Sequence, residues 1–179
     1  MPEVRFLFLG REEFNVLART GVPTAEDIAE VMPSKERLAK GAVAMIECFQ
    51  KIPCDPCYHS CKRQAIQPFA DINDRPRLDH DKCNGCAMCL SRCPGLAIFI
   101  IDQTYSADKA LIKIPYEYLP LPAEGHVVDA VNRAGQTVGE AQVVKVQSSE
   151  KLEGTNIVWL AVPHHLAMEV RHFKVKEVR

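Results

Sequence analysis

Several features are scarce in this 179-residue sequence, and each absence excludes a class of protein. The formal net charge is −1, so no excess of one sign draws the chain to nucleic acid or to an acidic membrane. The longest apolar run, residues 95–101, is far shorter than the roughly 20 residues that span a bilayer. The N-terminus carries several charges and lacks the long apolar core and cleavage site of a secretory signal. We therefore expect a cytoplasmic protein without a membrane span or a nucleic-acid partner.

Cysteine is missing from most of the chain, yet eight cysteines are concentrated between Cys48 and Cys93. An even cysteine count in a small secreted protein would predict a disulfide framework. Thiols in the cytosol stay reduced, so clustered thiols in a cytosolic protein are more typical of metal binding. The segment is therefore interpreted as a metal-binding region.

The cysteine-rich region contains an internal repeat with an offset of 32 residues. Its first half contains Cys54, Cys57, Cys61 and Ala65-Ile66, which correspond to Cys86, Cys89, Cys93 and Ala97-Ile98 in the second half. A repeat of this kind predicts two units with the same local fold. Two halves that each read C-x2-C-x3-C followed by Ala-Ile are typical of a two-cluster ferredoxin.

The spacing in the second half fits the geometry of an iron–sulfur cubane. A [4Fe–4S] cluster presents four iron corners, and each takes a soft thiolate ligand. Cysteines spaced C-x2-C-x2-C wrap a short loop around three corners. A cysteine four residues further on has entered the next helix and faces the other cluster. Pro94 would help to turn the chain after that ligand.

We therefore predict two [4Fe–4S] clusters that exchange their fourth ligands. The second-half cluster would be held by Cys83, Cys86, Cys89 and Cys61. The first-half cluster would be held by Cys54, Cys57, Cys93 and Cys48. Gly85 is expected to allow a tight loop whose backbone approaches the second-half cluster closely.

Cys48 departs from the repeat. Lys51 occupies the position that corresponds to Cys83, and its side chain cannot bind iron. Cys48 is the nearest free thiol, so we predict that it replaces the missing ligand. The alternative is a buried Cys48 that binds nothing, which would leave three ligands and a [3Fe–4S] cluster. Zinc is an alternative for the whole region, but zinc usually takes two well-separated C-x2-C pairs.

The segment before the repeat reads as helical. Residues 4–10 could form a strand, and Thr24 with Asp27 predicts a capped helix over residues 24–32. Ser34 is expected to cap a second helix that delivers Cys48 near its end. The apolar stripe of that helix would consist of Leu38, Ala42, Met45, Ile46 and Phe49.

The sequence changes in character after about residue 106, and from Gly125 it reads as short strands separated by turns. These strands are expected at residues 126–131, 137–147, 156–162 and 167–175, and a further strand is expected before them at residues 99–101. Residues 156–162 are apolar on both faces, so they should form a central strand with Trp159 in the core. The expected fold class is α+β. It comprises an N-terminal helical segment (1–45), a two-cluster ferredoxin module (46–108) and a small antiparallel β domain (109–179), for which a barrel is one arrangement.

Residues 46–101 resemble the bacterial-type two-cluster ferredoxin domain. The segments PSKERLAKGAVAMIECFQKIPCDPC and VNRAGQTVGEAQVVKV resemble the small iron–sulfur subunit of flavin-containing amino-acid dehydrogenases. That family includes proline and hydroxyproline dehydrogenase, opine oxidase and hydrogen-cyanide-synthase-like complexes. The resemblance implies a subunit that passes single electrons from a flavoprotein partner to an external acceptor, with no substrate chemistry of its own. Two alternatives stay open, a stand-alone ferredoxin and an assembly or binding module with structural clusters.

Overall fold

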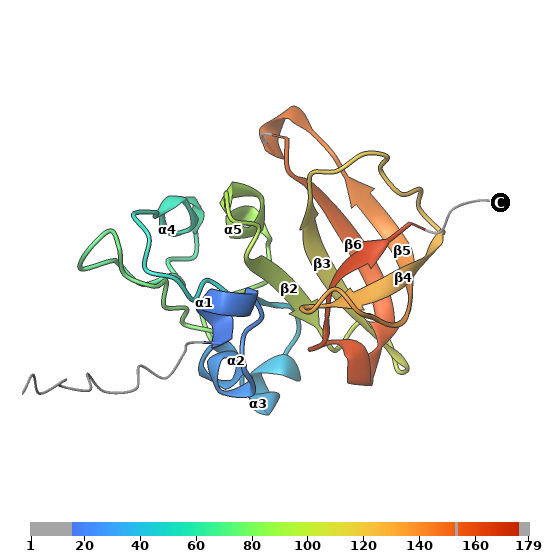
Figure 1. Ribbon diagram of the computed structural model, residues 1–179, viewed down its shortest axis with the longest axis horizontal. Coiled ribbons are helices and arrows are strands. Elements are labelled where there is room, and N and C mark those ends of the chain that lie inside the picture. Colours follow the sequence, from blue (N-terminus) through green and yellow to red (C-terminus); the bar gives the residue numbers. More distant parts are fainter. Residues whose placement is uncertain (1–15, 153, 176–179) are drawn as a thin grey trace, which may run out of the picture.

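The computed structural model describes residues 16–152 and 154–175 (Figure 1). The strand expected at residues 4–10 lies outside this part of the chain. The helices are α1 (Val16–Thr20), α2 (Ala25–Val31), α3 (Lys35–Leu38), α4 (Pro56–Ser60) and α5 (Met88–Arg92), with short 3-10 turns at Glu150–Leu152 and His164–Leu166. Among the described residues, no helix has both the length and the apolar character needed to cross a membrane.

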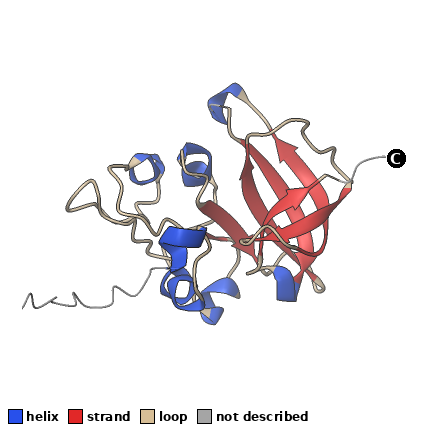
Figure 2. Ribbon diagram, viewed as in Figure 1, coloured by secondary structure: helices blue, strands red, loops and turns tan. Residues whose placement is uncertain are grey.

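Seven strands form one antiparallel sheet in the order β1-β2-β3-β6-β5-β4-β7. They are β1 (Val43–Ile46), β2 (Ile98–Asp102), β3 (Lys109–Tyr116), β4 (Val127–Asn132), β5 (Thr137–Gln147), β6 (Asn156–Pro163) and β7 (Val170–Lys174). Figure 2 shows the strands gathered at one end of the molecule and the loop-rich cysteine region at the other. The strands expected in the C-terminal part of the sequence are thus confirmed, with small shifts of their ends.

The predicted helix caps are present at the start of the described chain. Thr24 Oγ1 accepts the backbone N–H of Asp27 at 3.2 Å, and the Asp27 carboxylate accepts the backbone N–H of Thr24 at 2.8 Å. Ser34 caps α3 by accepting the backbone N–H of Arg37. Each cap satisfies a backbone N–H group that the first turn of a helix leaves unpaired.

The prediction of one long helix from Ser34 to Cys48 is wrong. Helix α3 ends at Leu38, and residues 43–46 form β1, which is buried on both faces. Val43 and Met45 pack into one core, and Ala44 and Ile46 pack into another. A short run that is apolar on both faces shows no strand alternation, so its residues can match helical spacing by coincidence. Gly41, at φ = +116°, separates the two elements with a conformation that disfavours other residues.

The sheet separates two hydrophobic cores. The sheet core lies inside the curled strands and includes Met45, Ile112, Leu160 and Phe173. The module core lies between the other face of β1, β2 and β6 and the cysteine-rich region, and it includes Ala44, Ile46, Ile98, Ile100 and Ile157. Strand β6 is the middle strand of the seven, as its apolar sequence predicts. Trp159 is only partly buried and packs against the edge of the module core.

The sheet is not closed into a barrel. Strand β2 occupies one edge of β3 along residues 111–113, and β6 occupies the other edge. Strand β7 therefore cannot hydrogen-bond to β3 there, although the sheet curls far enough for Tyr116 to stack on Phe173 with ring centroids 4.7 Å apart. Strand β2 lies in the cysteine-rich part of the chain, so the sheet crosses residue 108, where the sequence placed the end of the ferredoxin module.

Candidate metal centre

The two halves of the repeat share most of their local structure. Helices α4 and α5 lie at corresponding positions, 32 residues apart. After each helix the backbone turns through a left-handed residue, Gln64 or Leu96, and both have φ = +51°. The next N–H groups, of Ala65 and Ala97, then point at the sulfur atoms of Cys61 and Cys93 over 3.3 and 3.4 Å.

Corresponding strand pairs frame the two halves. Ile46 pairs with Ile98 at the end of β1, and Leu78 pairs with Ile66 in an isolated bridge. The next backbone hydrogen bonds also correspond, from Glu47 N–H to the carbonyl of Ala97 and from Asp79 N–H to that of Ala65. The repeat seen in the cysteines therefore extends to the backbone that positions them.

The eight cysteines gather around two small pockets. One pocket is lined by Cys61, Cys83, Cys86 and Cys89. The other is lined by Cys48, Cys54, Cys57 and Cys93. The remaining walls are largely apolar and include Ala44, Ile66 and Ile100 in the first pocket and Ile46, Ile52 and Ile98 in the second. The fold thus brings together the two sets of four cysteines that the sequence assigns to two clusters.

A buried thiol in each set resists ionisation. Burial, followed by the charges of Cys93, Cys54 and Cys48, raises the pKa of Cys57 to about 12. Burial, followed by the charges of Cys83, Cys86 and Cys61, also raises the pKa of Cys89. Iron binds the thiolate form, so its positive charge would compensate four thiolates that otherwise repel one another. The donor set and the apolar walls therefore fit a [4Fe–4S] cluster in each pocket.

A single metal ion would need a tighter arrangement. Within the described residues, no three or more His, Cys, Asp or Glu side chains are grouped to hold one metal ion. The thiols line the walls of two pockets instead.

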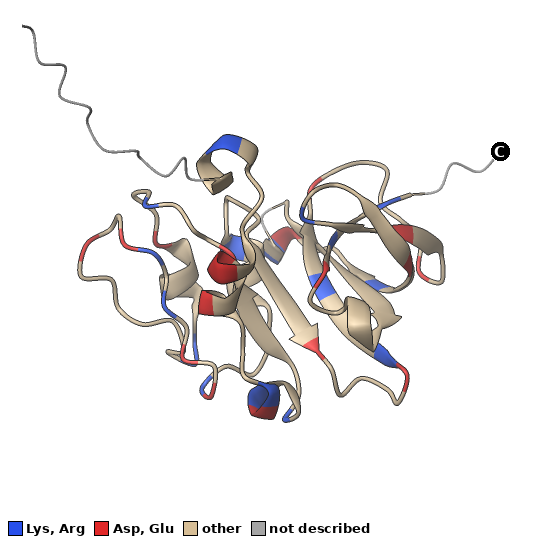
Figure 3. Cartoon of the chain, turned by 60° about the horizontal axis from the view of Figure 1, so that its bottom comes forward, with Lys and Arg blue, Asp and Glu red and all other residues tan. Residues whose placement is uncertain are grey.

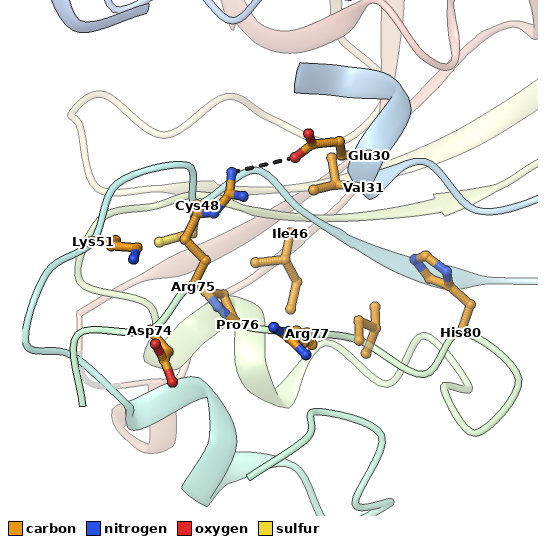
Figure 4. Close-up of a pocket in the computed structure, with 11 residues that line it drawn as sticks. Glu30, Val31, Ile46, Cys48, Lys51, Asp74, Arg75, Pro76, Arg77 and His80 are labelled. Carbon is orange, nitrogen blue, oxygen red and sulfur yellow. Dashed lines mark ion pairs between the residues drawn. The ribbon is translucent and has the colours of Figure 1, made fainter. Parts of the chain in front are cut away.

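Cys48 lies two residues beyond β1, so it is positioned by a strand and not by the expected helix. Burial raises the pKa of Cys48, as do the charges of Cys93 and Cys54, whereas Arg75 acts in the opposite direction. Cys48 also lines a neighbouring polar pocket with Lys51 and Arg75 (Figure 4). Arg75 is paired there with Glu30 at 3.5 Å. Lys51, which stands in the sequence where a ligand would be expected, thus faces a polar pocket.

Gly85 has a packing role in addition to the expected one. Its φ is +66°, a conformation that favours glycine. A Cβ atom at this position would lie 2.5 Å from the Cβ of Ala42 and 2.9 Å from the Ala42 carbonyl carbon. The loop between Cys83 and Cys86 therefore packs directly against the backbone that leads into β1.

Arg37 holds this loop in place, and no sequence pattern indicated this role. Its guanidinium is almost fully buried and donates hydrogen bonds only to backbone carbonyls. The acceptors are His80 (2.6 Å), Gly41 (2.9 Å), Ala42 (2.9 Å) and Cys83 (2.5 Å). Arg37 thereby ties the chain around Cys83 to the segment between α3 and β1.

A second buried network joins the cysteine-rich region to the C-terminal strands. The carboxylate of Glu47 accepts two hydrogen bonds from Arg133, at 2.7 and 2.8 Å, and one from Arg171 at 2.6 Å. Burial alone would raise the pKa of Glu47, but the hydrogen bonds and charges of the two arginines outweigh it and lower that pKa. Glu47 precedes Cys48, so this network fixes the chain next to a candidate ligand.

Comparisons with known proteins agree with this site. Residues 76–99 match the family model described as a 4Fe-4S binding domain. The chain contains a ferredoxin-type 4Fe–4S domain. Pyruvate synthase subunit PorD of Methanocaldococcus jannaschii is 40% identical over 47 residues, which cover 26% of this chain and 52% of the relative. The chain thus spans about half the length of that relative. No solved structure matches the chain.

These similarities support an iron–sulfur electron-transfer role for the ferredoxin-type domain. They do not extend to a flavin-containing dehydrogenase, so the narrower family resemblance read from the sequence is not supported by them.

Proposed function

We propose that the chain is an electron-transfer subunit that holds two [4Fe–4S] clusters and passes single electrons between a partner enzyme and an external acceptor. The observation that carries the proposal is the gathering of eight cysteines around two pockets, four to each. The proposed ligands are Cys61, Cys83, Cys86 and Cys89 for the second-half cluster and Cys48, Cys54, Cys57 and Cys93 for the first-half cluster. Each cluster, when bound, supplies a one-electron change of charge. The chain itself is expected to perform no substrate chemistry.

Backbone amides adjust the charge at the proposed ligands. The N–H groups of Ala44, Ala65 and Ala97 lie 3.3, 3.3 and 3.4 Å from the sulfur atoms of Cys83, Cys61 and Cys93, respectively. Such contacts stabilise negative charge on sulfur and favour the reduced form of a cluster.

The two proposed sites adjoin each other. Cys57 and Cys89 belong to different ligand sets, yet both are buried in the module core. The charge of Cys57 also contributes to the raised pKa of Cys89. Adjacent sites within a dry core suit the transfer of electrons from one cluster to the other.

Each proposed site also has a route to the surface. Cys86 is exposed beside the second-half pocket, and Met88 next to it is partly exposed. Ile52 is exposed at the first-half pocket, and Ile72, also exposed, accepts the backbone N–H of Cys54. Acidic and basic residues are interspersed along the chain (Figure 3). One opening would receive electrons and the other would release them.

The partner we propose is a flavin-containing amino-acid dehydrogenase in the cytoplasm, as the resemblance in residues 33–57 implies. The similarity to a pyruvate synthase subunit favours a second candidate, a pyruvate-oxidising partner. Both candidates make the chain one component of a hetero-oligomer. A stand-alone ferredoxin and a module with structural clusters are the other outcomes of the test.

The test is anaerobic purification of the tagged chain from its native host, followed by visible spectroscopy of the intact complex. We expect co-purified subunits with flavin absorbance, and bleaching of both flavin and iron–sulfur bands by an amino acid. Bleaching by pyruvate would favour the second candidate. A lone chain that reduces several acceptors would indicate a stand-alone ferredoxin. Clusters that stay oxidised under strong reductant would refute electron transfer.

A further inference from the structure

Strand β3 places a lysine of the C-terminal sheet beside the loop that carries Cys83 and Cys86. Lys113 lies between Ile100 of β2 and Trp159 of β6 in the register of the sheet. Its Nζ donates a hydrogen bond to the carbonyl oxygen of Gly85 at 3.2 Å. Gly85 stands between those two cysteines, so the lysine contacts the proposed ligand loop directly.

Lys113 is shielded from solvent. Its side chain is partly buried, and its Nζ lies 4.2 Å from the centroid of the Trp159 ring. Burial lowers the pKa of Lys113, while the charges of Asp102 and Cys86 act in the opposite direction. A charge in partly dry surroundings acts more strongly on its neighbours than the same charge in water.

The sheet also provides a matched comparison for this lysine. Lys145 of β5 pairs with the same Trp159, and its Nζ lies 5.4 Å from the ring centroid. Unlike Lys113, it is exposed, and no hydrogen bond links it to Gly85. The two lysines therefore carry the same charge near the same ring but differ in their contact with the ligand loop.

We propose that Lys113 is a positioning residue that fixes the Gly85 carbonyl and raises the reduction potential of the second-half cluster. Reduction adds one negative charge to a cluster, and a fixed cation nearby stabilises that charge. The C-terminal sheet thus separates the potentials of the two clusters and gives electron flow a direction. This inference rests on the proposed function, because it requires a cluster bound by Cys61, Cys83, Cys86 and Cys89.

The experiment is a redox titration of the anaerobically purified chain followed by EPR, with K113Q, K113R and K145Q compared with the wild type. In K113Q we expect one of the two potentials to become more negative and the other to stay unchanged. K113R keeps the charge and should restore the wild-type value. K145Q should leave both potentials unchanged, because its charge is exposed and screened.

Equal potentials in K113Q and the wild type, or equal shifts in K113Q and K145Q, would overturn the role of Lys113. If K113Q does not load clusters, K113M, which keeps an apolar side chain beside Trp159, decides the question. It should move the same potential in the negative direction. An unchanged potential in K113M would then overturn the inference. A wild-type chain without iron and sulfide would instead refute the proposed function, so the two failures are distinguishable.

Discussion

The network formed by Glu47, Arg133 and Arg171 should contribute strongly to stability, and E47Q tests this. The three side chains are 8%, 12% and 4% exposed, so both guanidinium groups depend on one buried carboxylate. Burial lowers the pKa of Arg171 only to about 10, and the group stays charged at neutral pH. Removing the carboxylate charge would therefore leave two buried cations without a counter-ion.

Breaking a buried ion pair typically costs about 3–5 kcal/mol. The lower end applies here, because Arg133 still donates to the carbonyl of Met168 and Arg171 still donates to that of Val170. A loss of about 3 kcal/mol, with a urea m-value of about 2 kcal/mol/M, lowers the unfolding midpoint by about 1.5 M.

The assay is anaerobic urea unfolding followed by circular dichroism. The matched control is E30Q, which breaks the pair between Glu30 and Arg75, whose side chains are 61% and 44% exposed. An exposed pair contributes about 0–1 kcal/mol, so E30Q should shift the midpoint by less than about 0.5 M. If E47Q and E30Q shift the midpoint equally, the network does not join the two parts of the chain as argued.

Three further predictions follow from the packing around the ligand loops. G85A should destabilise the chain by about 2 kcal/mol or more, because it adds a clash with Ala42 to an unfavourable φ; thermal unfolding should show little change for G95A, whose added Cβ meets nothing within 4 Å. R37M should lower the free energy of unfolding by about 3 kcal/mol and reduce the iron content, because buried carbonyls lose their hydrogen-bond donor. The control is K40M, which removes the exposed pair between Lys40 and Asp81. Equal iron content in both variants would show that Arg37 does not hold the loop around Cys83 in place. Burial lowers the pKa of His172 from 6.5, so the unfolded chain binds this proton more tightly. Stability should be constant above about pH 6.5 and fall as the pH drops below it; H172F should reduce that slope, and an unchanged slope would show that His172 is not responsible.

Local signals predicted much of the fold because they depend on neighbouring residues. The Thr24–Asp27 capping box and the strand from Thr137 to Gln147 are determined by short patterns, and both appear as expected. The cysteine repeat indicated two similar halves, and the structure shows matching helices, turns and strand pairs. The barrel is absent because β2, from the ferredoxin region, takes the edge of β3 that closure would need. Strands β2 and β3 are neighbours in the chain, but the sequence pattern does not show that β3 would use its free edge for β2 and not for closing the sheet.

The parts of the site that the sequence did not reveal depend on distant contacts. Arg37 in a short polar helix reads as a solvated residue, yet it is buried against the carbonyls of His80 and Cys83. Glu47 meets Arg133, in the turn after β4, and Arg171 of β7, both far along the chain. The residues of β1 matched helical spacing because both faces of that strand are buried. Lys113 likewise contacts the ligand loop only because β3 lies next to β2.

The most direct test of the account is the iron and acid-labile sulfide content of the anaerobically purified chain, measured with EPR of the reduced form. Two [4Fe–4S] clusters predict about eight iron and eight sulfide per chain, with signals from two interacting reduced centres. C48A should then lose iron and give a [3Fe–4S] signal. About four iron per chain would contradict the assignment of Cys48, Cys54, Cys57 and Cys93 to a second cluster. Zinc without sulfide would contradict the account as a whole.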